Sequence, residues 1–221
     1  MAIIAVVAFF VLLFIVFNNK EIVNLNALAK NDQAANQPAD TGSDTVVKTA
    51  VPALNDSDYF VGNKDAKVVL VEYTDFECPF CLKHSETSKK IKEMYGNKIL
   101  FVLRHFPLSF HENAQKAAEA AECAGEQGKF WQMYDVLFTA NANQNMGVAK
   151  WKSEAVKLGM NAKQFNDCLD SSKYAKKIAD EQAGGAAAGV DGTPATFING
   201  QLVSGAVPFE QFQTIIDGLL K

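Results

Sequence analysis

The sequence predicts an α/β fold in which a strand–helix–strand unit and a strand–strand–helix unit flank a long helical insertion. The first unit is indicated by an apolar, β-branched run at residues 67–74, a cysteine pair, and residues 82–95, which lack Gly and Pro. The second is indicated by two short apolar runs around Asn199-Gly200 and a following helical pattern. Between them, residues 112–182 carry apolar side chains at helical spacing.

Residues 1–17 are uncharged and wholly apolar. A spanning helix prefers roughly 20 such residues, with about 17 as the lower limit. A cleaved signal normally has a basic start and a small-residue cleavage site soon after its apolar core. No Lys or Arg precedes Lys20, and Ala27-Leu28-Ala29 lies well downstream. We therefore predict an uncleaved N-terminal transmembrane helix, with a cleaved signal as the alternative and a buried core helix disfavoured.

Residues 18–54 are rich in Asn, Ala, Gln, Asp, Thr and Ser, which predicts a flexible linker. Residues 55–221 are long enough to form a single globular domain with its own core. The net charge of −4, without a basic cluster, argues against a nucleic-acid partner.

Cys78-Pro79-Phe80-Cys81 follows the strand at residues 67–74 and precedes the helix at residues 82–95. Cys78 is therefore expected at the N-terminus of the helix, where unpaired N–H groups and the helix dipole favour a thiolate. A thiolate at this position can attack a disulfide, and Cys81 lies close enough to resolve the mixed disulfide. The pattern predicts a redox centre.

The cysteine pair has two other interpretations. A purely structural Cys78–Cys81 disulfide is one alternative. Zinc is disfavoured because a structural zinc site needs four ligands. The remaining candidate ligands are isolated and show no ligand spacing: Cys123, Cys168, His84, His105 and His111. Neither a metal nor an organic cofactor is required by the redox interpretation.

The insertion at residues 112–182 is expected to contain several helices whose apolar stripes form a core. Ala114, Ala117, Ala118 and Ala121 make a small-residue face suited to close helix packing. Cys123 and Cys168 lie on separate predicted helices. An even cysteine count in an exported chain favours a second disulfide between them, with two buried free thiols as the alternative.

The late hairpin is predicted at residues 195–198 and 201–204, joined by Asn199-Gly200 in a type I′ turn. Thr193-Pro194 directly precedes it. Pro208 then begins a helix with large apolar residues on one face: Phe209, Phe212, Ile216 and Leu219.

Over about residues 55–220, the sequence resembles the DsbA-like thioredoxin-fold disulfide oxidoreductases. Four motifs carry the resemblance: Glu72-Tyr-Thr-Asp-Phe-Glu-Cys-Pro-Phe-Cys81, Arg104-His-Phe-Pro-Leu108, Gly128-Lys-Phe-Trp131 and Gly189-Val-Asp-Gly-Thr-Pro-Ala-Thr-Phe-Ile-Asn-Gly200. The resemblance implies that the CxxC pair is the redox centre and that Pro194 is cis and lies against it. It also implies that Glu72 assists proton transfer at Cys81. The Pro-Phe dipeptide departs from the Pro-His of the strongest oxidases, so the pKa of Cys78 is expected to be lowered less than in relatives with that His.

Several residues around the pair have two interpretations each. Glu72 interrupts an apolar strand, and a buried carboxylate without a partner is costly, which favours a functional role over an outward-facing position. Asp75 and Glu77 either raise the pKa of Cys78 by repulsion or are ordinary solvated turn residues. His84 is expected to be a packed rather than a catalytic histidine.

These features predict a membrane-tethered, extracytoplasmic thiol-disulfide oxidoreductase. Phe80, Thr193 and Pro194 are expected to contact substrates, which would be cysteine-containing exported proteins. A membrane redox partner would restore the redox state of the cysteine pair after each reaction. A reductase or isomerase of the same fold is the first alternative, because direction depends on redox potential. A non-catalytic thioredoxin-fold chaperone or binding module is the second.

Overall fold

The computed structural model describes residues 52–221. The predicted membrane helix at residues 1–17 and nearly all of the predicted linker lie outside the described residues. From residue 52 to the end of the chain, no helix is both long enough and apolar enough to cross a membrane.

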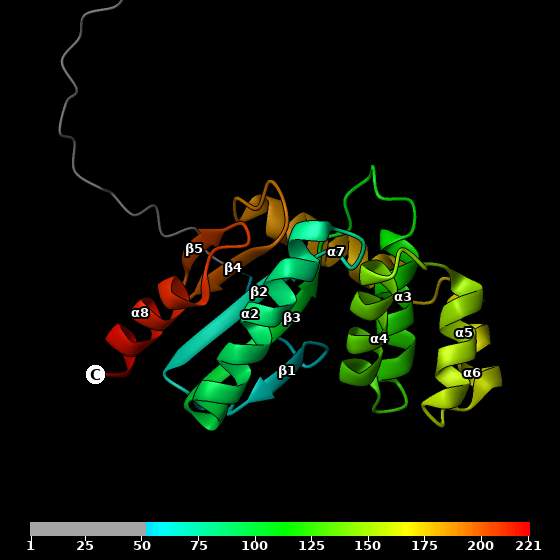
Figure 1. The fold of residues 1–221 in the computed structure, drawn as a ribbon, viewed down its shortest axis with the longest axis horizontal. Helices are drawn as coiled ribbons and strands as arrows, with labels where there is room; N and C mark the ends of the chain where they lie inside the picture. Colours follow the sequence, from blue (N-terminus) through cyan, green and yellow to red (C-terminus); the bar gives the residue numbers. More distant parts are fainter. Residues whose placement is uncertain (1–51) are drawn as a thin grey trace, which may run out of the picture. The chain divides into compact units, whose positions relative to one another are not determined.

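A five-stranded mixed sheet forms the centre of the domain (Figure 1). The sheet order is β1-β3-β2-β4-β5. Strands β2 and β3 are parallel, and the other neighbouring pairs are antiparallel. The strands are β1 (Tyr59–Gly62), β2 (Val68–Thr74), β3 (Ile99–His105), β4 (Ala195–Ile198) and β5 (Gln201–Ser204). The predicted α/β class is confirmed, and β1 is an edge strand that the sequence patterns did not indicate.

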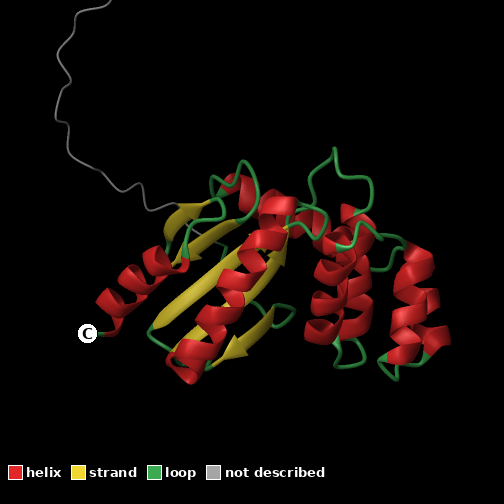
Figure 2. Cartoon of the chain, viewed as in Figure 1, coloured by secondary structure: helices red, strands yellow, loops and turns green. Residues whose placement is uncertain are grey.

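Helices occur both against the sheet and in the insertion, where α3 to α6 stand to one side of the sheet (Figure 2). The insertion extends beyond the predicted residue 182, because α7 continues to Ala187. The helical segments are α2 (Pro79–Tyr95), the short 3₁₀ helix η2 (Gly96–Lys98), α3 (Ala114–Gly125), α4 (Phe130–Ala142), α5 (Val148–Lys157), α6 (Ala162–Asp170), α7 (Ala175–Ala187) and α8 (Phe209–Leu220).

Alternate residues of β2 point to opposite faces of the sheet, as a strand requires. Val68 and Leu70 pack with residues of α2 and α8 in one apolar cluster. Tyr73 belongs to a second cluster on the other face, where α7 lies. Gly185 of α7 allows a close approach there, because a Cβ at this position would lie 2.7 Å from the Tyr73 ring. The two helical layers therefore fix the orientation of β2.

The insertion has its own core, which includes the cysteine pair. Cys78, Cys81 and Phe76 share one apolar cluster with Trp151 of α5 and Met133 of α4. A disulfide joins Cys123 of α3 to Cys168 of α6. The turn that carries the cysteines is thus packed against the insertion and not only against the sheet.

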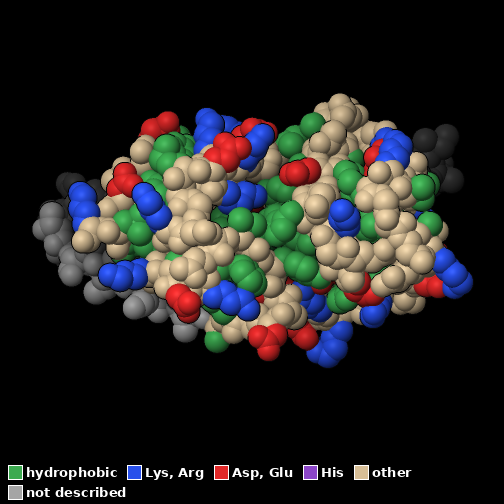
Figure 3. Space-filling view, turned by 90° about the horizontal axis from the view of Figure 1, so that it is seen from below, with side chains coloured by type: hydrophobic (Ala, Val, Ile, Leu, Met, Phe, Trp, Pro, Cys, Tyr) green, Lys and Arg blue, Asp and Glu red, His purple; other side chains and the backbone are tan. Residues whose placement is uncertain are grey.

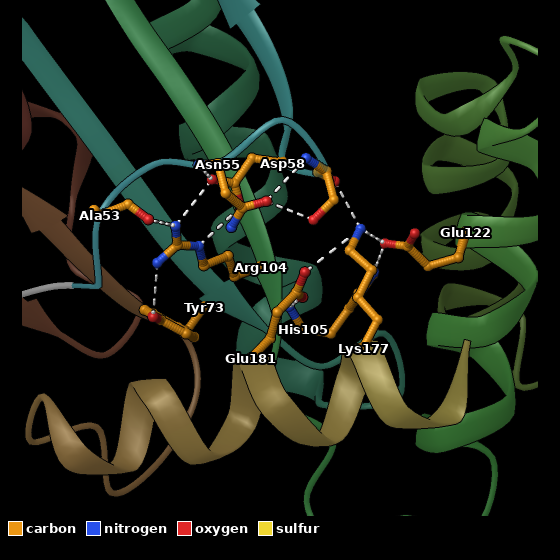
Figure 4. Close-up of polar contacts among 10 residues, drawn as sticks. Ala53, Asn55, Asp58, Tyr73, Arg104, His105, Glu122, Lys177 and Glu181 are labelled. Carbon is orange, nitrogen blue, oxygen red and sulfur yellow. Dashed lines mark hydrogen bonds and ion pairs between the residues drawn. The ribbon is translucent and has the colours of Figure 1, made fainter.

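Arg104 of β3 anchors the beginning of the described chain (Figure 4). Its guanidinium donates to both carboxylate oxygens of Asp58, at 3.0 and 2.9 Å. It also donates to the carbonyls of Pro52 and Ala53, each at 2.9 Å. Both members of the Arg104–Asp58 pair are buried, so removing either one would leave an uncompensated charge.

A second polar cluster joins β3 to α3 and α7 (Figure 4). The imidazole Nε2 of His105 lies 3.0 Å from Glu122 Oε1, and its backbone N–H donates to Glu181 at 2.7 Å. Lys177 donates to Glu122 at 2.6 Å. This cluster holds the insertion against the end of β3.

Candidate active site

Cys78 occupies the N-cap position of α2, with φ −70° and ψ 126°. The helix begins at Pro79 and not at residue 82, because proline fits the first helical position, where its missing N–H costs nothing. The backbone N–H of Leu82 donates to the Cys78 carbonyl at 3.0 Å. Cys81 therefore lies in the first turn, as the sequence predicts.

The Cys78 thiol is held in a setting that favours its anion. When protonated, the thiol donates to the carbonyl oxygen of Thr193 at 3.5 Å, and other groups favour the anion. A hydrogen bond from Cys81 is the largest influence on the pKa of Cys78; it outweighs burial and, with the backbone N–H groups of Cys81 and Phe80, lowers that pKa to about 6. Cys78 is therefore mostly a thiolate at neutral pH.

Cys81 has the opposite character, although it lies three residues away. Its side chain is fully buried, and burial is the main reason that its pKa is raised. The backbone N–H of Asp75 donates to its Sγ at 3.4 Å. One sulfur is thus held as a reactive anion and the other as a protonated thiol. Both cysteines are in the reduced form in this structure.

The segment before β4 lies against the cysteines. The Thr193-Pro194 peptide bond is cis, which is the conformation that the resemblance implied for Pro194. The Thr193 side chain contributes to lowering the pKa of Cys78, and the backbone carbonyl of the same residue contacts the Cys78 Sγ.

Glu72 lies on β2, fully buried and facing α2. Its Oε2 accepts a hydrogen bond from Ser88 at 2.6 Å and lies 3.5 Å from His84 Nε2. Burial alone would raise the pKa of Glu72, but His84, Ser88 and the charge of Lys92 together lower it. Its second oxygen, Oε1, has no partner among the described residues. Glu72 is therefore a buried carboxylate with a lowered pKa and one oxygen that lacks a partner among the described residues.

His84 and Ser88 are partners of Glu72 that sequence reasoning did not identify. His84 is packed, as predicted, but its ring also lies near the carboxylate and 3.4 Å from the Thr196 hydroxyl. A signal was present in the spacing, because Cys81, His84 and Ser88 follow one another at helical intervals on the inner face of α2.

A cleft of about 620 Å³ lies between α2 and α4. Lys92 lines it, and its ammonium group lies 4.8 Å from the ring centres of both Trp131 and Tyr134. Seen from below, hydrophobic side chains gather between the sheet half and the insertion half of the molecule, with charged side chains around them (Figure 3). The Lys92 charge is therefore held in largely aromatic surroundings.

Asp75 and Glu77 are not the solvated turn residues that one interpretation predicted. Asp75 is buried, and its carboxylate accepts hydrogen bonds from the backbone N–H of Leu108 and from His111 Nδ1, both at 2.8 Å. The Glu77 carboxylate accepts from the Asn113 side chain at 2.9 Å. Both carboxylates thus bind the segment between β3 and α3. Neither carboxylate is among the main influences on the pKa of Cys78, and that pKa is lowered by hydrogen bonds.

Phe80 is 64 % exposed and lies two residues after the buried Cys78. Within residues 52–221, no cluster of three or more His, Cys, Asp or Glu side chains is arranged to hold a metal. The structure provides a thiol whose pKa is lowered, a buried thiol whose pKa is raised and a buried carboxylate.

The chain is similar in sequence and in structure to known proteins. A family model described as Thioredoxin matches residues 54–218. The chain therefore belongs to the thioredoxin family, and its structural neighbours give it the DsbA-like form of the fold. It is similar to alpha-DsbA1 from Wolbachia pipientis, with a TM-score of 0.67 and 24% identity over 76% of this chain and 92% of that one. It is also similar to BdbD from Bacillus subtilis, with a TM-score of 0.66 and 19% identity over 74% and 93% of the two chains.

Curated relatives share this domain within longer proteins. The Na(+)/H(+) antiporter NhaA 1 of Salinispora arenicola is 34% identical over 175 residues, which is 79% of this chain and 26% of that protein. NhaA 1 of Mycolicibacterium vanbaalenii is 36% identical over 157 residues, covering 70% of this chain and 25% of that protein. The chain thus spans about a quarter of the length of these relatives, and the similarity concerns that portion.

Proposed function

We propose that this protein is a thiol-disulfide oxidoreductase with Cys78 as the exchanging sulfur and Cys81 as the resolving thiol. The observation that carries the proposal is the contrast between the two sulfurs. The pKa of Cys78 is lowered to about 6, whereas burial raises the pKa of Cys81. Membership of the thioredoxin family supports the same chemistry.

In the oxidising direction, a substrate thiolate attacks the Cys78 sulfur of a Cys78–Cys81 disulfide. A substrate–Cys78 disulfide forms, and Cys81 leaves as a thiolate that takes up a proton. A second substrate thiolate then attacks the substrate sulfur of this mixed disulfide and releases Cys78 as a thiolate. The substrate loses two electrons and gains a disulfide, and the cysteine pair gains the two electrons.

Glu72 is proposed to carry the proton in this exchange. It is ionised and buried, so it can accept the Cys81 proton when Cys81 must attack and return it when Cys81 leaves. Thr193, Pro194 and the exposed Phe80 are proposed to contact the substrate on either side of Cys78.

The oxidising direction is supported by the acidity of Cys78. A thiolate stabilised in the reduced protein makes the reduced form more favourable and the disulfide more oxidising. The protein would then form disulfides in exported proteins, and a membrane redox partner would reoxidise it. The alternative is a reductase or isomerase of the same fold. Measuring the reduction potential of the Cys78–Cys81 couple against glutathione distinguishes them: a value near or below that of the glutathione pool would favour the alternative.

We further propose a domain at residues 55–221 that is tethered outside the cytoplasm through a linker at residues 18–54 and a membrane helix at residues 1–17. The Cys123–Cys168 disulfide supports this location, because stable disulfides belong to oxidising compartments. Protease added to intact spheroplasts should release the domain. Protection until the membrane is broken would place the domain in the cytoplasm.

Trapping tests the assignment of the two sulfurs. Cys81→Ser should accumulate mixed disulfides with cysteine-containing proteins, because Cys78 still exchanges and nothing resolves the product. Cys78→Ser is the matched control and should trap few or none. Equal trapping by both variants would reject the assignment. Failure of the wild type to reduce insulin would instead favour a non-catalytic chaperone or binding module.

A further inference from the structure

Asp75 lies in the turn between β2 and α2, and its backbone contacts both cysteines of the redox centre. Its N–H group donates to Cys81 Sγ at 3.4 Å. Its carbonyl oxygen accepts a hydrogen bond from the backbone N–H of Cys78 at 3.2 Å. A backbone donor of Asp75 is therefore in direct contact with one of the two sulfur atoms between which the disulfide forms.

The Asp75 side chain fixes the direction of this N–H group. Oδ1 accepts from the backbone N–H of Glu77 at 2.8 Å. Oδ2 accepts from the backbone N–H of Leu108 and contacts His111 Nδ1, both at 2.8 Å. The carboxylate is thus held both by its own turn and by the segment between β3 and α3. A donor that is oriented before the reaction needs no reorganisation when negative charge develops in front of it.

The sulfur that this N–H group contacts has few other means of stabilising a charge. Cys81 is fully buried, so water does not solvate it. Burial is the main reason that the pKa of Cys81 is raised, and Cys78 raises it further, whereas the Thr193 side chain and the Asp75 N–H act to lower it. At neutral pH, Cys81 is therefore an anion only briefly, while its bond to Cys78 breaks or forms.

We propose that the backbone N–H of Asp75 is a catalytic group that stabilises the Cys81 thiolate as it leaves, and that the Asp75 carboxylate positions this N–H. The inference rests on the proposed function and deepens it. When a substrate thiolate attacks Cys78 Sγ, the substrate–Cys78 bond forms and the Cys78–Cys81 bond breaks. The electron pair of the broken bond goes to Cys81 Sγ, which accepts the Asp75 hydrogen bond and is then protonated.

This role changes rates and not the redox equilibrium. In the two resting forms of the protein, Cys81 is either part of a disulfide or a protonated thiol, and neither form carries the charge that the N–H group stabilises. An interaction that is stronger in the transition state than in the resting forms accelerates the reaction in both directions. Loss of the N–H group should therefore slow the opening of the disulfide without changing its reduction potential.

The sharpest test replaces the N–H of residue 75 by an ester oxygen, with the α-hydroxy analogue of aspartate incorporated into the full-length chain. The ester keeps the carboxylate and removes only the donor. Asp75→Asn is the second variant, because an amide cannot accept hydrogen bonds at both of its ends and so orients the N–H less well. Glu77→Gln is the matched control. The Glu77 carboxylate accepts from Asn113 and so binds the same segment, but the Glu77 N–H points to the Asp75 carboxylate and not to a sulfur.

Each oxidised protein is mixed with reduced glutathione, and the opening of the disulfide is followed by labelling the peptide that contains Cys78. The reduction potential and the alkylation rate of reduced Cys78 are measured beside it. The ester should open about 100-fold more slowly than the wild type, the lower end for the loss of one such donor. Asp75→Asn should open about tenfold more slowly, and Glu77→Gln at the wild-type rate, with the potential and the alkylation rate unchanged in all three.

Opening of the ester at the wild-type rate overturns the inference. Equal slowing in Asp75→Asn and Glu77→Gln also overturns it, because the effect would then come from loosening the segment between β3 and α3. Slower opening of the ester together with a changed potential or a changed alkylation rate of Cys78 would show a general disturbance of the site and likewise overturn it. Failure of the oxidised wild type to react with glutathione would contradict the proposed function instead.

Discussion

The acidity of Cys78 should depend on the hydrogen bond that it receives from Cys81. That bond is the largest influence lowering the pKa of Cys78. Cys81→Ala removes the donor, whereas Cys81→Ser keeps an O–H group at the same place and serves as the matched control. Both variants remove the resolving thiol, so any difference between them reports the hydrogen bond alone.

The size of the effect follows from the cost of losing a hydrogen bond to a charged group, about 1.5–3 kcal/mol. One pKa unit corresponds to about 1.4 kcal/mol, so the pKa should rise by about one to two units in Cys81→Ala. The wild-type value is lowered to about 6. At pH 7 the thiolate fraction would then fall from about nine-tenths to between about one-half and one-tenth.

The thiolate absorbance of each variant is measured against pH, with Cys78→Ser as the blank. We expect Cys81→Ser to titrate close to the wild-type pH and Cys81→Ala to titrate higher. Identical titrations of the two variants would refute the reasoning, because the acidity would then arise from the helix terminus and Thr193 without Cys81.

Three further outcomes are expected. The pKa of Cys78 is lowered to about 6 in the folded reduced protein. The thiolate therefore stabilises the fold fully above the unfolded pKa of about 8.5, and this stabilisation is lost as the pH falls through about 6. Urea unfolding should show the reduced form losing stability relative to the oxidised form over that pH range. Arg104→Met leaves Asp58 buried and unpaired, so the free energy of unfolding should fall by about 3–5 kcal/mol, and by less in Arg104→Lys. Replacing Cys123 and Cys168 by Ala opens a loop with a sequence separation of 45, and calorimetry should show a loss of about 4 kcal/mol in the chain-entropy model.

The elements that the sequence predicted best are those whose ends are set by the conformational preferences of a few neighbouring residues. The β4–β5 hairpin has the predicted bounds, because Asn199 and Gly200 adopt the positive φ angles, 48° and 86°, that a type I′ turn requires. The start of α2 differs from the prediction by three residues, although Pro79 at the first helical position could have indicated it. Strand β1 has only four residues and is defined by its pairing with β3, which no local pattern reveals.

In the candidate active site, too, the sequence predicted what depends on neighbouring residues and not what depends on packing between distant elements. The positions of Cys78 and Cys81 follow from a strand-to-helix junction, which is a local feature. The partners of Glu72 and Asp75 come from other elements, so their environments depend on packing. Asp75 contacts His111 across 36 residues of sequence. That contact converts an apparent surface carboxylate into a buried acceptor, and no spacing rule predicts it.

Glu72 is buried in β2, and its Oε1 has no hydrogen-bond partner among the described residues. Glu72→Gln keeps the size of the side chain and its contact with Ser88 but removes the base. If Glu72 carries the Cys81 proton, resolution of a mixed disulfide should slow by roughly 100-fold, the lower end of general acid–base effects. The first attack by Cys78 should change much less, because its thiolate is stabilised by Cys81 and backbone groups instead. Rapid-mixing kinetics separate the two steps. Equal slowing of both steps would mean that the substitution disturbs the site as a whole, and an unaffected resolving step would remove Glu72 from the mechanism.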